Sequence, residues 1–217
     1  MKRDEILVPR YRLTQRIWHW LFTLAFLVLL FSGLALFIPA VSVWTASETG
    51  RLVHRIAAVV LIVTPILYAI TDWQGFSQLI HDSFTYDADD MAWFKHFIPY
   101  VFGKAKNLPP QGRINAGEKI HHASIIVGIV VIAISGLILW LWKGISPSGY
   151  MITLLIHDIA MFVLAILTIG HIFFVFVYGA FSGMWKGYVT ETYAKLEHPK
   201  WLSQMKREGK LVNSQKI

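Results

Sequence analysis

Histidine is the residue type in this sequence with the clearest potential for chemistry. Nine histidines are present, and four of them, His19, His54, His157 and His171, lie in or at the ends of long apolar runs. Ionisable side chains are costly in such segments and usually mark a function. His157 and His171 are 14 residues apart, which in an α-helix separates them by about 21 Å along the axis and by about 40° around it. One helix therefore presents two imidazoles on one face at two depths.

The other two histidines supply one partner at each depth. His19 begins the first apolar run and matches the depth of His171, whereas His54 begins the second run and matches His157. A haem iron takes axial nitrogens from two sides, and the macrocycle fits between the apolar helices of a bundle. The pattern predicts two b haems that transfer electrons, because protein occupies both axial positions. The predicted metal ligands are His19, His54, His157 and His171.

The other five histidines show no such pairing. His81 and His96 belong to a polar connector, and His198 belongs to the C-terminal tail. His121 and His122 open the third apolar run, where we expect a boundary position. Contact with a quinone or a haem propionate is the alternative for these two residues.

Four apolar runs must position the histidines. Each run reaches the ~20 residues that an α-helix needs to cross a bilayer, and the runs lack the alternation of barrel strands. The sequence therefore predicts an all-α integral membrane protein, a four-transmembrane-helix bundle that forms a single membrane domain over 1–217. The expected spans are 17–38, 52–70, 119–142 and 151–180, with a connector at 72–118 and a tail at 181–217.

Composition agrees with a membrane location and excludes several chemistries. Hydrophobic residues make up 55% of the 217 residues and charged residues only 15%, whereas soluble domains carry about a quarter charged residues. The chain has no cysteine, which excludes disulfides, thiolate nucleophiles and an iron–sulfur cluster held by its own cysteines. The net charge of +7 does not indicate nucleic acid, because the position of the charges in so apolar a chain matters more than their sum.

The distribution of lysine and arginine predicts the orientation. Seventeen of these residues lie in the N-terminal arm, the connector with the adjoining Lys119, and the tail, and only Arg51, Arg55 and Lys143 lie toward the opposite side. Positive charge accumulates on the cytoplasmic side, so we expect both termini in the cytoplasm and the basic arm and tail on anionic lipid. In the connector, apolar residues recur at helical spacing, which is typical of segments in the headgroup region. Asp87, Asp89 and Asp90 there are expected to form a solvated turn.

Six stretches of the sequence resemble the gamma (cytochrome b) subunit of respiratory formate dehydrogenase, and the resemblance covers residues 10–202. The stretches are Arg16-Ile-Trp-His19-Trp20, Gly50-Arg-Leu-Val-His54, Arg113-Ile-Asn115-Ala-Gly117-Glu-Lys119, Leu154-Leu-Ile-His157, Gly170-His171 and Ala194-Lys-Leu-Glu-His-Pro199-Lys-Trp201.

This resemblance implies a subunit of the bacterial inner membrane that passes electrons through two haem b groups to menaquinone. It implies an iron–sulfur (beta) subunit as donor and a molybdenum- or tungsten-containing (alpha) subunit that oxidises formate. It places His54 and His157 on the outer haem, and His19 and His171 on the cytoplasmic haem. The quinone would bind at Asn115 and Gly117, where an amide and a backbone N–H can hydrogen-bond a carbonyl. A polar residue such as Asn115 before a helix is, however, usually a cap.

Three alternatives remain at this point. The cytochrome b subunit of a membrane-bound hydrogenase has a similar architecture, although the stretch from Asn115 to Lys119 favours formate dehydrogenase. A histidine-lined metal-ion transporter would bring the four histidines to one midplane site, which their two depths argue against. A membrane anchor without cofactor would have little reason to carry paired histidines. The roles of His121, His122 and Asp158 are not predicted.

Overall fold

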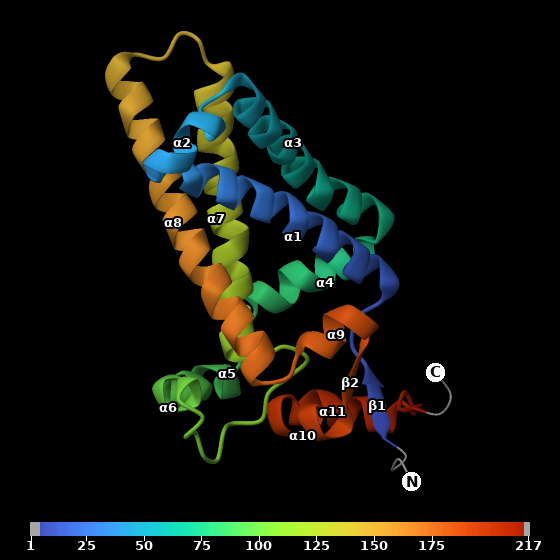
Figure 1. The fold of residues 1–217 in the computed structure, drawn as a ribbon. Coiled ribbons are helices and arrows are strands. Elements are labelled where there is room, and N and C mark those ends of the chain that lie inside the picture. Colours follow the sequence, from blue (N-terminus) through green and yellow to red (C-terminus); the bar gives the residue numbers. More distant parts are fainter. Residues whose placement is uncertain (1–4, 215–217) are drawn as a thin grey trace. The chain divides into compact units, whose positions relative to one another are not determined.

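Four long apolar helices dominate the computed structural model, which describes residues 5–214 (Figure 1). Within those residues, the helices long and apolar enough to cross a membrane are four in number. They are α1 (Leu13–Leu34), which a short 3-10 turn η1 (Ala35–Phe37) extends, α3 (Glu48–Thr71), α7 (Ala116–Leu141) and α8 (Pro147–Val177). The predicted fold class is confirmed. Lys2, Arg3 and Lys216, which were counted for the orientation, lie outside the described residues.

Each helix begins three or four residues before the apolar run that predicted it. Polar residues at the helix starts explain the difference: the Ser47 side chain accepts a hydrogen bond from the Gly50 N–H and caps α3. Such caps satisfy backbone donors that a helix end leaves unpaired. The apolar run contains only the residues suited to the lipid interior, whereas the helix extends further, to the polar residues that cap it.

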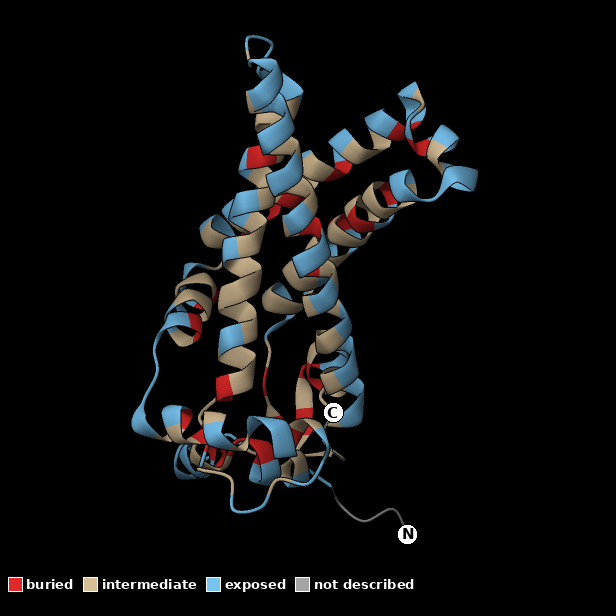
Figure 2. Cartoon of the chain, turned by 90° about the vertical axis from the view of Figure 1, so that its left-hand side faces the viewer, coloured by how far each residue is buried: buried red, intermediate tan, exposed pale blue. Residues whose placement is uncertain are grey.

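The long helices leave most of their apolar surface uncovered by the protein. Only 6% of the most apolar stretch of α7 is buried, and 17% of the corresponding stretch in each of the other three. Figure 2 shows this as long helices with few buried positions. Soluble proteins rarely expose so much apolar surface, so a bilayer is the environment that these helices fit.

Contacts divide the chain into two units, which are described separately. The first, which we call the hairpin unit, comprises 17–76 and 124–170. It holds most of the α1–α3 and α7–α8 helical hairpins. Ala25, Ala57, Leu61, Met161 and Leu164 are among its buried apolar residues. The loop of the first hairpin contains α2 (Pro39–Thr45).

The second unit, called here the mixed unit, comprises 5–16, 77–123 and 171–214 of the described residues. It contains a three-stranded antiparallel sheet in the order β2-β1-β3, made of β1 (Ile6–Pro9), β2 (Tyr188–Thr190) and β3 (Val212–Asn213). Val8 pairs with Val189 in this sheet. The helices α9 (Phe181–Lys186), α10 (Glu191–Glu197) and α11 (Pro199–Arg207) complete the C-terminal part.

The mixed unit has a core of its own. Its buried residues are Val8, Val189, Ala194, Trp201, Leu202 and Met205. The sequence analysis did not predict these strands. Each is two to four residues long, and paired residues are 179 to 207 positions apart in the chain, so no local pattern reveals them.

The connector forms helices, as its apolar spacing predicted. These are α4 (Trp73–Phe84), α5 (Ala88–Trp93), the 3-10 turn η2 (Phe94–His96) and α6 (Phe97–Val101). The prediction of a solvated acidic turn is wrong for Asp90, which is 2% exposed and forms an ion pair with Lys119. Asp87 caps α5 by accepting from the Asp90 N–H at 2.9 Å. A hydrogen bond from Lys200 lowers the pKa of Asp87 to about 2.

Candidate functional site

Two of the four predicted ligands lie in the hairpin unit, each bonded to a serine of the preceding helix of its hairpin. His54 of α3 has its Nδ1 2.7 Å from Oγ of Ser32 in α1. His157 of α8 has its Nδ1 3.0 Å from Oγ of Ser135 in α7. Each of the two helical hairpins thus contains one contact between a serine and a histidine.

The serine contacts fix which ring nitrogen carries the proton. Ser32 donates its hydroxyl proton to the Val28 carbonyl at 2.7 Å, and Ser135 donates to the Val131 carbonyl at 2.8 Å. A hydroxyl has one proton, so each Oγ must act as acceptor toward the imidazole. Nδ1 is therefore the protonated nitrogen of both rings. Nε2 keeps its lone pair, as an axial ligand of haem iron requires.

The sequence carries a signal for this arrangement that the sequence analysis missed. A Ser-Gly-Leu triplet starts at Ser32 and again at Ser135, and each serine precedes its histidine by 22 residues. The glycine in each triplet allows a close approach. A Cβ on Gly136 would lie 3.1 Å from Cε1 of His157, and one on Gly33 would lie 2.9 Å from Sδ of Met161.

The triplets also relate two further histidines. His19 precedes Ser32 by 13 residues, and His122 precedes Ser135 by the same number. The chain thus contains a spaced repeat of histidine, serine and histidine. His122 has a buried Nδ1 for which the described residues provide no hydrogen-bond partner.

The other predicted pair is divided between the units. His19 is in the hairpin unit, where its ring packs edge-on against Trp20 with centroids 5.2 Å apart. His171 is in the mixed unit, stacked on His121 with centroids 4.9 Å apart and planes 7° from parallel. The pairing of His19 with His171 stays a prediction.

The two predicted quinone contacts lie at the start of α7. Asn115 is the helix cap, since its Oδ1 accepts from the Glu118 N–H at 2.8 Å while Glu118 Oε2 accepts from the Asn115 N–H at 2.8 Å. Gly117 is tightly packed, because a Cβ there would lie 2.8 Å from the Trp93 ring. Both residues have structural roles, which leaves the quinone role a prediction.

A buried polar network in the mixed unit was not predicted. Arg10 donates to Glu118 Oε1 at 3.0 Å. His198, which is 0% exposed, bonds through both ring nitrogens: its Nδ1–H donates to the Gly112 carbonyl at 2.9 Å, and Tyr193 donates its hydroxyl to Nε2 at 3.2 Å. Burial lowers the pKa of His198 to about 3, and the positive charge of Arg10 acts in the same direction.

A second buried acid, Glu197, precedes His198 in the sequence. Tyr100 donates its hydroxyl to Glu197 Oε2 at 2.8 Å. Burial raises the pKa of Glu197 above its usual value. This network ties the connector to the C-terminal helices of the same unit.

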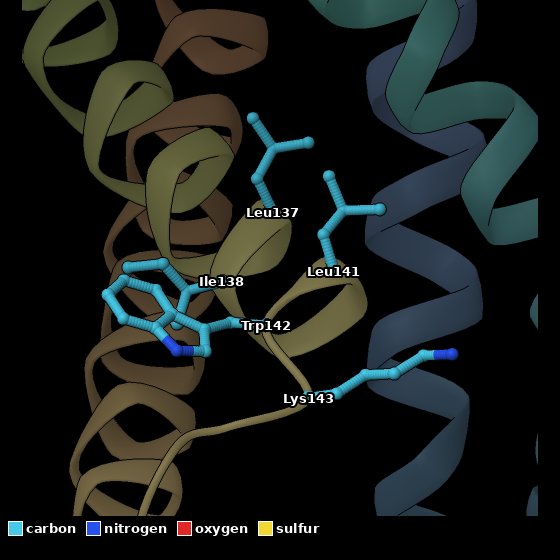
Figure 3. Close-up of a pocket in the computed structure, with 5 residues that line it drawn as sticks. All are labelled: Leu137, Ile138, Leu141, Trp142 and Lys143. Atoms are coloured by element: carbon cyan, nitrogen blue, oxygen red, sulfur yellow. The ribbon is translucent and has the colours of Figure 1, made fainter.

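Two pockets of the hairpin unit contain none of the candidate ligands. One, of about 480 Å³, lies at the end of α7 and is lined by Leu137, Ile138, Leu141, Trp142 and Lys143 (Figure 3). The other, of about 320 Å³, is an apolar groove between α1 and α3. Over residues 5–214, no three His, Cys, Asp or Glu side chains gather as a metal-binding group. Two histidines that bind one haem iron do not require a cluster of three metal-binding side chains.

Apolar spanning helices, with imidazoles whose Nε2 atoms are kept unprotonated, define a haem-binding membrane protein. The residues present fit haem b, because imidazoles are its usual donors and the tautomers of His54 and His157 leave Nε2 able to bind iron. Residues 10–187 match the family model of prokaryotic cytochrome b561. The chain belongs to this family.

Individual relatives agree with the resemblance seen in the sequence. The chain is 26% identical to the formate dehydrogenase cytochrome b556 subunit of Haemophilus influenzae, over 96% of this chain and 89% of that protein. It is 26% identical to the formate dehydrogenase cytochrome b556(fdo) subunit of Escherichia coli, over 95% and 97%. The nitrate-inducible cytochrome b556(Fdn) subunit of Escherichia coli is 25% identical, over 95% of both chains. The resemblance is confirmed.

Proposed function

We propose that the chain is the di-haem cytochrome b membrane subunit of a formate dehydrogenase complex. It accepts electrons from an iron–sulfur (beta) subunit and delivers them to menaquinone, and it anchors the complex in the bacterial inner membrane. Formate is oxidised on a separate molybdenum- or tungsten-containing (alpha) subunit. The repeated serine–histidine pair is the observation that carries the proposal, because it prepares two imidazoles for iron in one unit.

The relatives support the choice of complex. Three related proteins over nearly the full chain are named as formate dehydrogenase subunits, which favours formate dehydrogenase over a hydrogenase. The identities of 25–26% leave the donor to be tested directly.

Depth in the spans supports all four ligands, and the serine contacts support His54 and His157 in addition. His54 and His157 hold the haem on the side of Arg51 and Arg55, and His19 and His171 hold the haem on the side of the basic arm and tail. A bound haem supplies one-electron transfer at its iron. The excess of positive charge in the arm, the connector and the tail supports a cytoplasmic location of both termini.

The start of α7 can hold the quinone. Backbone donors in the first turn of a helix have no intrahelical acceptor. The Ala116 N–H is bonded to Gln111 and the Glu118 N–H to Asn115. No acceptor for the Gly117 N–H is described in the structure. This N–H and the amide of Asn115 are donors for a quinone carbonyl, and proton uptake there would draw on the cytoplasm.

The test is formate-driven reduction in membranes that contain the tagged chain with its native partners. We expect formate to reduce a b-type absorption band, a menaquinone analogue to reoxidise it, and an iron–sulfur subunit to co-purify. Reduction by hydrogen but not by formate would identify a hydrogenase subunit instead. A purified chain without any haem absorption would contradict the assignment as a cytochrome.

A further inference from the structure

Ser32 and Ser135 are buried polar residues of the hairpin unit. They are 8% and 4% exposed. Each contacts the histidine of the other helix in its hairpin, as described above. We propose that they are positioning residues for His54 and His157, that they hold the two rings as neutral Nδ1–H tautomers, and that they set the reduction potential of the haem between them. This inference rests on the proposed function.

A bond from serine to its own helix backbone is common in membrane helices and alone would indicate nothing. The hairpin unit shows such a case: Thr64 of α3 donates to the Val60 carbonyl at 2.7 Å and is 2% exposed. No contact of Thr64 with a histidine is among the described interactions. Ser32 and Ser135 differ from Thr64 because their oxygens accept a second bond, from an imidazole.

Contacts with backbone carbonyls hold the Oγ atom of each serine in place. Oγ of Ser32 lies 2.7 Å from the Val28 carbonyl and 3.1 Å from that of Leu29. Oγ of Ser135 lies 2.8 Å from the Val131 carbonyl and 3.1 Å from that of Ile132. A hydroxyl anchored in this way has little rotational freedom. The imidazole that donates to it is held at Nδ1, which leaves Nε2 in one orientation.

The same bond has an electronic consequence. A metal-binding histidine that donates the N–H of its other ring nitrogen to an acceptor becomes a more basic ligand. A more basic ligand stabilises ferric over ferrous iron and therefore lowers the potential. Loss of the acceptor also leaves a buried N–H without a partner, which costs free energy. Both serines act on one haem if His54 and His157 share it.

The experiment is a redox titration of the purified complex with the variants Ser32→Ala, Ser135→Ala, Ser32→Thr and Ser135→Thr. Thr64→Val is the matched control, because it removes a buried hydroxyl that bonds only to its own helix. Haem content, the two midpoint potentials and the paramagnetic resonance of the ferric low-spin haems are measured.

We expect both alanine variants to raise the potential of the same haem and to leave the other unchanged. A tenfold loss of the preference for ferric iron corresponds to about 59 mV for one electron. The resonance of that haem alone should change, and retention of that haem should weaken by about 10–100-fold. The threonine variants and Thr64→Val should match the wild type.

Unchanged potentials in both alanine variants would overturn the inference while leaving the proposed function intact, since the wild type would still contain two haems. Shifts in two different haems would overturn the shared site. A wild-type chain without haem would overturn the proposed function and this inference together, so the two failures are distinguishable.

Discussion

The two units contain histidines that are bonded in opposite ways. In the hairpin unit, His54 and His157 each bond through Nδ1 to a serine, which leaves the lone pair of Nε2 available to a metal. In the mixed unit, His198 bonds through both ring nitrogens and is completely buried. The number of ring nitrogens already bonded thus separates a histidine that can bind iron from one that holds the structure together.

The residues that surround these histidines also differ between the two units. The hairpin unit supplies apolar helices and single hydroxyl contacts, which suit a macrocycle. The mixed unit supplies charges and strands: Arg10 contacts Glu118, and the sheet joins the N-terminal arm to the C-terminal part. His198 is therefore part of a saturated network.

The largest expected effect comes from replacing one histidine of each kind by alanine. His157→Ala should remove one haem and abolish electron transfer to quinone, because axial ligation is lost. His198→Ala should keep both haems and lower stability by about 1–3 kcal/mol for each partner left unpaired. Haem content per chain and thermal unfolding measure the two outcomes. Loss of haem in His198→Ala, with both haems retained in His157→Ala, would reverse the comparison.

The sequence was sufficient for the part of the fold that depends on composition. The four spans and the helical connector follow from apolar runs and spacing. The pairing of histidines by depth stays a prediction: His54 and His157 lie in one unit, whereas His19 and His171 are divided between the two. The sheet, the burial of Asp90 and the network of His198 could not be predicted, because each depends on partners far away in the sequence. The serine contacts were predictable in principle from the repeated Ser-Gly-Leu triplet.

A smaller effect is expected at the start of α7. Asn115→Ser keeps an oxygen that can cap the helix but removes the amide donor. We expect the KM for a menaquinone analogue to rise about tenfold, which corresponds to one hydrogen bond, with haem content unchanged. Asn115→Ala should show the same rise together with about 1 kcal/mol of lost stability from the missing cap. A KM equal to that of the wild type in both variants would restrict Asn115 to capping.

A further expected effect is a pH dependence of the mixed unit. The folded pKa of His198 is lowered to about 3, whereas an unfolded histidine has a pKa near 6.5. The unfolded state therefore binds more protons as pH falls below 6.5, and stability falls by up to about 1.4 kcal/mol per pH unit until about pH 3. His198→Gln should reduce this slope in unfolding experiments between pH 6.5 and 4. An identical slope in the variant would show that other groups cause it.

The sharing of one haem by His54 and His157 can be measured most directly from haem content in three variants. His54→Ala, His157→Ala and the double variant should each retain one haem per chain, with the spectrum of the same remaining haem. Retention of one haem in each single variant but none in the double variant would contradict the account, because the two histidines would then belong to different haems.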